Sequence, residues 1–342
     1  MDSIDPVALA RMLIDIDSTT GREGEVAGVL ARLLRDRGYS VLEQPLGSAV
    51  FDDAGSPRTN VIAAVGEPRV VFSTHFDCVP PFFPSRIDGD LLYGRGACDA
   101  KGILAAQVAA AERLRAAGET GIGLVFVAGE ERGSDGAKAA NTIASTTAFL
   151  INGEPTDLRL GSATRGAFRV RLTAQGKAAH SGYPELGESA IDKLIDCLNA
   201  LRAATWPSDP LLGTTHHTVG LIKGGVAPNV IAPQAEAEVF FRTVGDHDAV
   251  RATLAAAVAG RVKVEEILEL PAVRLHTVPG FETAVFSYFS DVPFLSNWGT
   301  PLLLGPGSIH VAHTDREHIR IGELREAVEV YARLATMLMR PA

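Results

Sequence analysis

Histidine and acidic residues stand directly after apolar runs of this sequence, and their types suit metal binding. His75 and Asp77 form an H-x-D pair just beyond the run that ends at Thr74. Side chains at positions i and i+2 of an extended segment point to the same side, so this imidazole and carboxylate are delivered together. A metal-bound imidazole often donates its other N–H to a carboxylate. The pair is common in loops, so it indicates a metal site only if further ligands join it.

Further carboxylates follow other apolar runs. Asp99 lies in a glycine-containing loop before an alanine-rich segment, Glu130 and Glu131 come just after Ala128, and Glu154 comes just after Asn152. Carboxylates gathered at one edge of a sheet repel one another unless cations neutralise them. This coincidence is the strongest indication from the residues alone that the chain holds metal ions.

A histidine from the end of the chain completes the set. The segment Gly305–Thr314 follows a last apolar run, and either His310 or His313 can supply the missing imidazole. No G-x-G-x-x-G follows a strand and no GxxxxGK[ST] is present, so the sequence offers neither a dinucleotide fingerprint nor a phosphate loop.

The elements that must position these residues form an α/β sheet. Continuous apolar runs at 69–74, 123–128 and 147–152 are typical of strands buried on both faces. They alternate with helical segments such as 101–117, which indicates a mainly parallel sheet with ligands at its carboxyl edge. Near the start of the chain, 20–23 has the T-x-x-E form of a capping box, which predicts that a helix begins there.

The pattern changes near Gly166. Segments 168–173 and 235–240 alternate apolar and polar residues, which is typical of antiparallel strands with one face in water. Buried runs return after about Leu275, with 301–304 and a final amphipathic helix along 324–338. We therefore expect a discontinuous catalytic domain over 1–165 and 275–342, with a smaller α+β domain inserted at 166–274. A length of 342 residues agrees with two domains, because single cores stop growing at roughly 250–300 residues.

Composition excludes several classes of protein. The chain has 32 basic and 41 acidic residues, a formal net charge of −9, which argues against a nucleic-acid partner. The first residues contain no Lys or Arg, and no apolar stretch reaches the ~20 residues of a membrane span, so we expect neither a signal peptide nor a membrane partner. Cys78, Cys98 and Cys197 are an odd number without a CxxC pair, which predicts reduced thiols in a cytoplasmic protein.

With these residues in hand, the chain resembles the dizinc metallopeptidase and amidohydrolase family of acetylornithine deacetylase, succinyl-diaminopimelate desuccinylase, aminoacylase and glutamate carboxypeptidase. Five motifs in order carry the resemblance: H-x-D at 75–77, GRGxxDxKG at 94–102, GEE at 129–131, GEP at 153–155 and GPGSIxxAHTxxE at 305–317. It covers essentially the whole chain. It implies a mainly parallel mixed-sheet catalytic domain of the zinc-peptidase kind, with an inserted α+β lid through which two chains form a homodimer.

The resemblance also implies a ligand set. One metal takes His75 and Glu154, the other takes Glu131 and His313, and Asp99 bridges both. Such mixed nitrogen and oxygen ligation suits two Zn²⁺ ions per chain, with Co²⁺ or Mn²⁺ as possible substitutes.

Catalytic roles follow from the same motifs. Asp77 orients His75, and Glu130 is the general base that takes a proton from the attacking water and passes it to the leaving nitrogen. Family members often have a cis peptide after the bridging aspartate, here Asp99–Ala100. In the lid, His180 matches the histidine that reaches the neighbouring subunit's active site and stabilises the oxyanion.

The substrate's carboxylate has two predicted partners. Asn229 and Arg242 match the family positions that hold this group, and a guanidinium is its natural bidentate partner. Before the last motif, 290–294 (SDVPF) stands where the family usually has an Asp-Ala-Arg-like run.

We therefore expect a metal-dependent hydrolase that cleaves the amide bond of a small N-acyl amino acid, as a deacetylase or desuccinylase does. The alternative is an exopeptidase, a carboxypeptidase or dipeptidase, that uses the same site on a short peptide. A catalytically silent binding paralogue is a more remote alternative, because every catalytic position is filled.

Overall fold

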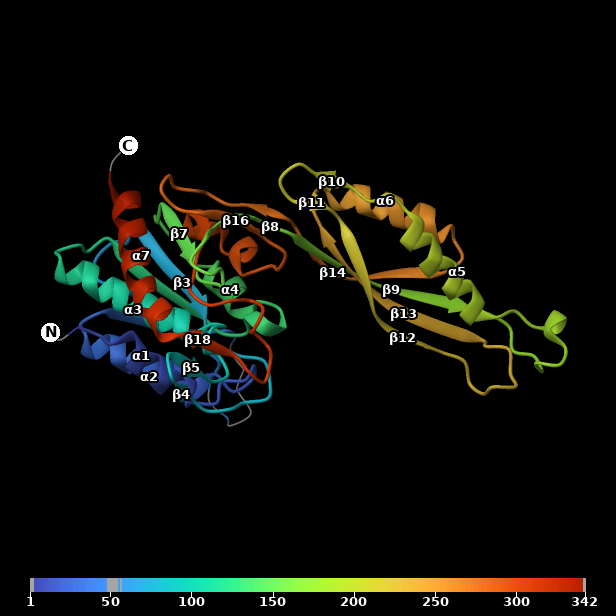
Figure 1. Cartoon of the computed structure of the whole chain (residues 1–342), viewed down its shortest axis with the longest axis horizontal. Helices are drawn as coiled ribbons and strands as arrows, with labels where there is room; N and C mark the ends of the chain where they lie inside the picture. Colours follow the sequence, from blue (N-terminus) through green and yellow to red (C-terminus); the bar gives the residue numbers. More distant parts are fainter. Residues whose placement is uncertain (1–2, 48–54, 56, 341–342) are drawn as a thin grey trace. The chain divides into compact units, whose positions relative to one another are not determined.

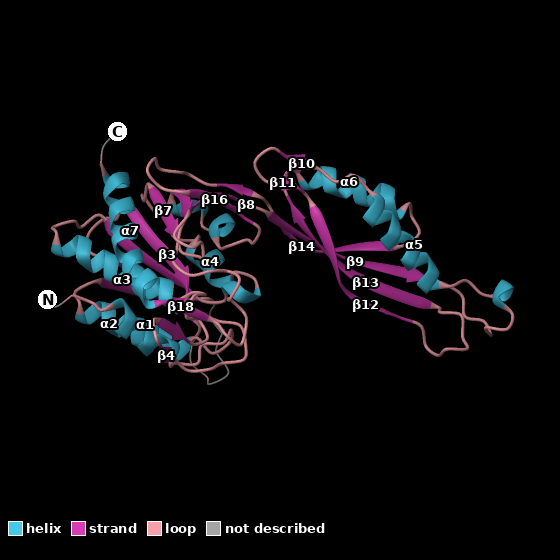
Figure 2. Cartoon of the chain, viewed as in Figure 1, coloured by secondary structure: helices cyan, strands magenta, loops and turns pink. Residues whose placement is uncertain are grey.

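The structure is a computed structural model, and it describes residues 3–47, 55 and 57–340. The chain forms two compact units. The larger comprises Met1–Ser162, Leu275–Ala284 and Ser290–Ala342, and the smaller comprises Ala163–Arg274 and Val285–Phe289. Figure 1 and Figure 2 show the elements of each unit.

A six-stranded sheet forms the centre of the larger unit, in the order β1-β2-β6-β3-β7-β17. Its strands are β1 (Ser40–Pro45), β2 (Thr59–Ala64), β6 (Ile122–Val127), β3 (Val70–His75), β7 (Phe149–Asn152) and β17 (Thr300–Leu303). The last four run parallel to one another, whereas β2 is antiparallel to both β1 and β6. The prediction of a mixed, mainly parallel sheet is therefore confirmed.

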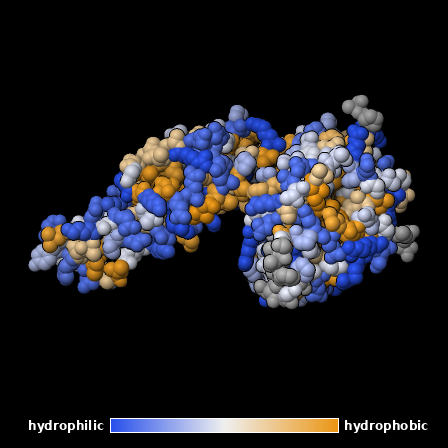
Figure 3. Space-filling model, turned by 180° about the vertical axis from the view of Figure 1, so that it is seen from behind, coloured by the Kyte–Doolittle hydropathy of each residue, from blue (hydrophilic) through white to orange (hydrophobic). Residues whose placement is uncertain are grey.

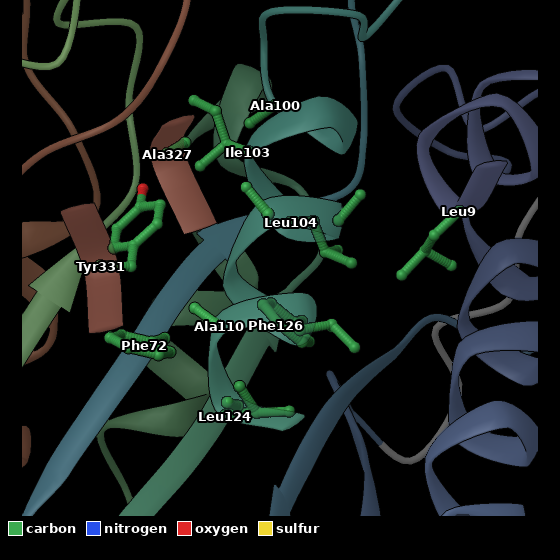
Figure 4. Close-up of a cluster of buried hydrophobic side chains, with 14 of the residues drawn as sticks. Leu9, Phe72, Ala100, Ile103, Leu104, Ala110, Leu124, Phe126, Ala327 and Tyr331 are labelled. Atoms are coloured by element: carbon green, nitrogen blue, oxygen red, sulfur yellow. The ribbon is translucent and has the colours of Figure 1, made fainter. Parts of the chain in front are cut away.

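Helices cover both faces of this sheet, which explains why its strands β3 and β6 are buried throughout. Leu124 and Phe126 of β6 pack with the helices α1 (Pro6–Ile14), α2 (Gly24–Asp36), α3 (Lys101–Ala116) and α7 (Ile321–Met339). Val125 and Val127 point to the opposite face, where α4 (Asp135–Ala140) lies. Figure 4 shows side chains of α3 among Phe72, Leu124, Phe126 and Tyr331. The α3 helix is buried along most of its length, so its position, and that of the loop before it, is firmly fixed.

Three short sheets are also present among the described residues: the first given below belongs to the larger unit, the second contains residues assigned to both units, and the third belongs to the smaller unit. They contain β4 (Arg86–Asp88), β5 (Leu91–Tyr93) and β18 (His318–Arg320); β8 (Leu160–Thr164), β15 (Val273–Arg274) and β16 (Thr283–Phe286); and β10 (Ser208–Asp209) with β11 (Gly213–Thr214). The antiparallel pairing of β18 with β5 brings the segment after Tyr93 next to the segment before His318.

The smaller unit has an antiparallel sheet in the order β12-β13-β9-β14. Its elements are β9 (Gly166–Gln175), α5 (Ala190–Ala203), β12 (His216–Gly224), β13 (Gln234–Thr243), α6 (His247–Val258) and β14 (Lys263–Leu270). Alternate residues of β9 and β13 are buried against α5 and α6, as the two-residue periodicity predicted. In space-filling view, apolar side chains remain visible among polar ones on the surface of this unit (Figure 3).

The capping-box prediction is wrong. Helix α2 begins at Gly24, and no side chain caps it. The Glu23 carboxylate instead accepts hydrogen bonds from the Arg58 guanidinium at 2.6 and 2.9 Å. The Thr20 hydroxyl is also engaged elsewhere, in the loop after β3. The buried ion pair with the distant Arg58 therefore takes the Glu23 carboxylate away from the capping role that the local sequence pattern predicts.

Two further features concern the chain as a whole. Cys78, Cys98 and Cys197 are all buried free thiols, as predicted. Within the described residues, no helix combines the length and the apolar character needed to cross a membrane.

Candidate metal centre

Strand register places the predicted ligands at one edge of the large sheet. His75 is the last residue of β3 and pairs with Val127, the last residue of β6. On the other side of β3, Ser73 pairs with Asn152 at the end of β7. The segments that carry Glu130 and Glu154 therefore leave the sheet beside His75, at its carboxyl edge.

His75 is fully buried and has both ring nitrogens engaged. Its Nδ1 lies 3.0 Å from the backbone carbonyl oxygen of Asp77 and 3.5 Å from Oδ1 of that residue. Its Nε2 lies 3.1 Å from Oδ1 of Asp99. Donation from Nδ1 to the carbonyl leaves Nε2 as the ring atom that faces the centre.

Asp99 faces two histidines with its two carboxylate oxygens. Oδ1 lies 3.1 Å from Nε2 of His75, and Oδ2 lies 3.1 Å from Nε2 of His313. The same Nε2 of His313 lies 3.0 Å from Oε1 of Glu131. Of the two histidines left open by the sequence, His313 is therefore the one that meets these carboxylates, and Asp99 occupies the position of a bridging group. The Asp99–Ala100 peptide is cis.

Glu130 and Glu154 complete a buried cluster of carboxylates. They are 8% and 5% exposed, and Oε1 of Glu154 has no hydrogen-bond partner among the described residues. Burial raises the pKa of both carboxyls well above the ordinary value, and neighbouring carboxylates reinforce the shift, Glu154 for Glu130 and Asp99 for Glu154. Burial likewise raises the pKa of Glu131.

The pKa values of the two histidines, His75 and His313, are raised as well. Contacts with Asp77 and Asp99 raise the pKa of His75 well above its ordinary value, although burial opposes the rise. Contacts with Asp99 and Glu131 raise the pKa of His313 to about 10. Both shifts favour a protonated imidazole beside a carboxylate, and metal binding requires that such a proton be released.

These residues fit a pair of divalent cations. One ligand atom each from His75, Asp99 and Glu131 lies within 4.8 Å of the others. An imidazole nitrogen and a carboxylate oxygen that face each other need a proton or a cation between them, and a buried, unpartnered carboxylate oxygen needs the same. Mixed imidazole and carboxylate donors suit Zn²⁺ and its neighbours in the first transition series.

Asp77 binds the backbone of the segment that carries Glu130 and Glu131. Its Oδ1 accepts a hydrogen bond of 3.0 Å from the backbone N–H of Glu130, and its Oδ2 accepts one of 3.3 Å from that of Glu131. The Thr20 hydroxyl donates to Oδ2 at 2.8 Å. The carboxylate therefore fixes the backbone of the two glutamates, while its own carbonyl oxygen is the nearer partner of His75.

The predicted residues of the smaller unit fall into two places. His180 and Asn229 lie in adjoining loops, because Ser181 N–H donates to the Asn229 carbonyl at 3.0 Å and His180 pairs with Val230. Both loops lie beyond the end of the sheet where β13 begins and β9 ends. Arg242 lies near the other end of β13, eight positions after Gln234, which is roughly 26 Å along a strand. Within one chain, a small substrate cannot contact both Asn229 and Arg242.

Arg242 keeps part of its guanidinium free of hydrogen bonds among the described residues. Its guanidinium lies 4.7 Å above the Phe240 ring, and its buried Nη1 has no hydrogen-bond partner within the described part of the chain. Burial lowers the pKa of Arg242. Opposite it on β12, Nδ1 of His216 lies 2.7 Å from Nη1 of Arg165.

Sequence reasoning missed three residues that support the centre. Thr20 binds Asp77, and Glu317 binds the backbone of the Asp99 loop. Asp291 is 1% exposed, and neither of its carboxylate oxygens has a hydrogen-bond partner among the residues described. Burial raises the pKa of Asp291 to about 6. Only Glu317 left a signal in the sequence, as the last residue of the final motif.

The fold and the cluster of imidazoles and carboxylates are those expected of a metallohydrolase, and comparison identifies the family. Residues 71–337 match the model of peptidase family M20/M25/M40, and the chain belongs to this family. A peptidase M20 domain-containing protein of Schizosaccharomyces pombe is 36% identical over 98% of this chain and 85% of its own length. A protein of Aspergillus terreus described as a probable carboxypeptidase is 37% identical over 96% of this chain and 85% of its own length.

Solved structures share the fold. Aminopeptidase PepT of Bacillus cereus superposes with a TM-score of 0.80 at 21% identity, covering 98% of each chain. The metallo-carboxypeptidase Sso-CP2 of Sulfolobus solfataricus gives 0.75 at 16% identity, covering 99% of each chain. Family membership confirms the predicted class of enzyme, a metal-dependent hydrolase of amide bonds.

Proposed function

We propose that this protein is a dimetal hydrolase that cleaves the last amide bond of its substrate. The reaction releases the residue that bears the free C-terminal carboxylate. The observation that carries the proposal is the placement of Asp99, whose two oxygens each face the Nε2 of a different histidine. His75, Asp99 and Glu154 would hold one cation, and Asp99, Glu131 and His313 would hold the other. Zn²⁺ is the proposed metal, and Co²⁺ or Mn²⁺ suits the same donors.

When bound, such cations lower the pKa of water and polarise an amide carbonyl. Glu130 is the proposed general base. Burial raises its pKa above the ordinary value, which suits a group that takes a proton from the attacking water and passes it to the leaving nitrogen. Asp77 keeps Glu130 in place through the backbone N–H of that residue.

The substrate side of the proposal depends on the smaller unit. Arg242, with an unpartnered Nη1, is the proposed receptor of the substrate's carboxylate. His180 and Asn229 are proposed to act from the neighbouring subunit, because one chain keeps them far from Arg242. His180 then supplies a positive or hydrogen-bonding group to the developing oxyanion, and Asn229 assists in holding the carboxylate.

Assembly into a homodimer is part of this proposal. Strand β12 is an edge of the small sheet, and its Leu221 and Ile222 are 65% and 61% exposed. Exposed apolar residues on an unpaired edge favour pairing with another chain. We also propose a cytoplasmic location, which the three free thiols support.

Between the two candidate substrates, the comparisons favour the peptide. Relatives in Aspergillus are described as probable carboxypeptidases, at 37% and 36% identity. An N-acyl amino acid is the second candidate, because it presents the same carboxylate and the same amide bond. A simple acyl group needs only a small pocket on the acyl side, whereas a peptide needs an open one.

A panel of blocked substrates tests the proposal. Metal-reconstituted protein is incubated with Gly-Leu, N-acetyl-Leu, acetylornithine, succinyl-diaminopimelate, an N-blocked dipeptide and the C-terminal amide of Gly-Leu. We expect hydrolysis of the dipeptides, with the N-blocked one retained as a substrate and the C-terminal amide lost. Cleavage of the amide but not of the N-blocked dipeptide would make the enzyme an aminopeptidase and overturn the proposal. Preference for the acylated amino acids would select the second candidate.

A further inference from the structure

A fully buried carboxylate, that of Glu317, gathers the backbone of the loop that carries Asp99. Its Oε1 accepts hydrogen bonds from the N–H groups of Gly96 at 2.9 Å, Cys98 at 3.2 Å and Asp99 at 3.2 Å. Its Oε2 accepts one of 2.6 Å from Nη1 of Arg95. The Cys98 thiol also lies 3.7 Å from Oε1. Glu317 is 0% exposed, so these protein donors take the place of water around its carboxylate.

Arg95 is itself held in place. It is 2% exposed, its Nε donates to the Pro81 carbonyl at 3.2 Å, and its guanidinium lies 4.9 Å from the centre of the Phe83 ring. The pair is therefore anchored to a third segment of the chain and cannot move without breaking contacts there. Removing one partner would leave the other charge buried and unpaired, which is strongly destabilising.

The loop that Glu317 holds has little freedom of its own. Gly96 has φ +89°, and a Cβ added there would lie 2.8 Å from Sγ of Cys78. Gly102, at the start of α3, leaves no room for a side chain, since an added Cβ would lie 2.1 Å from the Ala97 carbonyl oxygen. The backbone thus follows one tight path, and Glu317 satisfies the N–H groups that this path turns inward.

Glu317 also belongs to the segment that carries His313. The backbone carbonyl of Glu317 accepts a hydrogen bond of 3.2 Å from Gly94 N–H, and the next residue, His318, pairs with Tyr93. One residue therefore joins the loop of Asp99 to the segment of His313. Asp99 and His313 contact each other through Nε2 of His313, and Glu131 contacts the same nitrogen.

We propose that Glu317 is a positioning residue for the metal centre: through the backbone of 96–99 it holds the Asp99 carboxylate in its bridging place and fixes its distance from His313. The inference rests on the proposed dimetal function. It gives the buried ion pair of Glu317 and Arg95 a role in metal binding rather than in substrate contact. Partners of metal ligands commonly affect metal affinity by about 10–100-fold.

The substitution Glu317→Gln tests this directly. The amide keeps one accepting oxygen but turns an NH₂ group toward either Arg95 or the three backbone donors. Co²⁺ is titrated into metal-free protein, with visible absorption and electron paramagnetic resonance as readouts. Wild-type protein is expected to take up two equivalents and to show magnetic coupling between them. In Glu317→Gln, we expect the second equivalent to bind 10–100-fold more weakly and the coupling signal to change.

Glu323→Gln is a matched control. Glu323 is a partly buried carboxylate of α7 whose Oε1 accepts a hydrogen bond of 2.7 Å from Gly307 N–H. It therefore supports the segment of His313 without touching the loop of Asp99. We expect it to change the affinity for the second equivalent by less than about 3-fold, since it leaves the ligands and their immediate partners in place.

Three outcomes separate the possibilities. Wild-type protein that binds no second Co²⁺ would refute the dimetal function itself. If wild type binds two and Glu317→Gln binds both with unchanged affinity and spectra, the inference is wrong, even if the variant melts at a lower temperature. If Glu317→Gln does not fold, Arg95→Lys decides: it keeps a positive charge for Oε2 and the three backbone contacts, but it loses the guanidinium contacts with Pro81 and Phe83 that anchor the pair. A weakening of about 3–10-fold supports the inference, and unchanged binding overturns it.

Discussion

The hydroxyl of Thr20 donates a hydrogen bond of 2.8 Å to Oδ2 of Asp77. Asp77 in turn accepts from the backbone N–H groups of Glu130 and Glu131. A residue near the start of the chain thereby fixes the carboxylate that sets the backbone of the proposed base and of a proposed ligand. The contact is local in space and distant in sequence, across 57 positions.

Replacing Thr20 by Val should loosen this support without unfolding the protein. The substitution preserves shape and removes one hydrogen bond, so we expect a loss of about 1 kcal/mol in stability and a metal affinity about 10-fold weaker. Metal affinity is measured by competition with a chromophoric chelator. Thr19→Val is the matched control, because the Thr19 hydroxyl binds Asp17 rather than Asp77. Equal effects of the two substitutions would show that the Thr20 contact has no special role.

Glu130→Gln should separate catalysis from metal binding. The amide cannot accept a proton, so kcat should fall roughly 10³-fold, within the range of general-base contributions. Because Glu130 is not a proposed ligand, the variant should still hold two metal ions per chain in elemental analysis. Glu131→Gln is the contrast: its oxygen lies 3.0 Å from Nε2 of His313, and its loss should cost one equivalent of metal. Substantial activity in Glu130→Gln would refute the assignment of the base.

Metal binding should release protons. In the metal-free protein the pKa of His313 is raised to about 10, so its imidazole is protonated at pH 7, and contacts with Asp77 and Asp99 raise the pKa of His75 as well. Ligation requires the neutral imidazole, so affinity should rise with pH, by about tenfold per unit for each proton displaced. Calorimetric titration with Zn²⁺ in buffers of different ionisation enthalpy counts these protons, and His313→Asn should release one fewer. Heats that do not depend on the buffer would contradict this prediction.

The sequence predicted the ligand edge because that edge depends on short-range order. Strands β3, β6 and β7 are continuous apolar runs, and each is followed at once by chemistry-bearing residues such as His75, Glu130 and Glu154. Parallel strands bring these ends together whatever the remaining details. The predicted helices and alternating strands are present for the same reason. Burial of one or both faces of an element requires apolar residues at a regular spacing, and that spacing is visible in the sequence.

The supporting contacts could not be predicted in this way. Thr20 and Glu23 form a sound local pattern, yet both side chains bind residues that only folding brings near, Asp77 and Arg58. Asp291 has no sequence signature beyond a carboxylate in a loop, and only its burial makes it notable. Such contacts depend on where backbone loops cross, which neither periodicity nor motif spacing specifies.

Asp291 should destabilise the metal-free protein as pH rises. Burial raises its pKa from 3.8 to about 6, so the folded state binds more protons than the unfolded state between these values. Stability then falls as pH rises from about 4 to about 6 and levels off above, by about 3 kcal/mol at most. Asp291→Asn mimics the protonated form, so with chelator present it should melt at a higher temperature than wild type at pH 7 and at the same temperature near pH 3.5.

Thermal unfolding at several pH values between 3.5 and 7.5 measures this difference. The exposed Asp36 provides the control, and the gap between Asp291→Asn and wild type is compared at each pH with the gap between Asp36→Asn and wild type. A gap between Asp291→Asn and wild type that does not grow with pH would contradict the prediction. A gap that grows and then closes on addition of Zn²⁺ would show that metal offsets the same buried charge.

The separation of His180 from Arg242 along the small sheet predicts that two chains share each active site. Chains carrying His180→Ala should lack the oxyanion group, and chains carrying Glu130→Gln should lack the base, so each homodimer should be at least 10²-fold less active than wild type. In a heterodimer of the two, the site with an intact Glu130 receives His180 from the other chain. Co-expression with two affinity tags yields this heterodimer, which should have about half the wild-type activity. A heterodimer of Glu130→Gln with the Glu130→Gln/His180→Ala double variant is the control and should stay inactive. If the first heterodimer is no more active than its parents, His180 does not act across the interface.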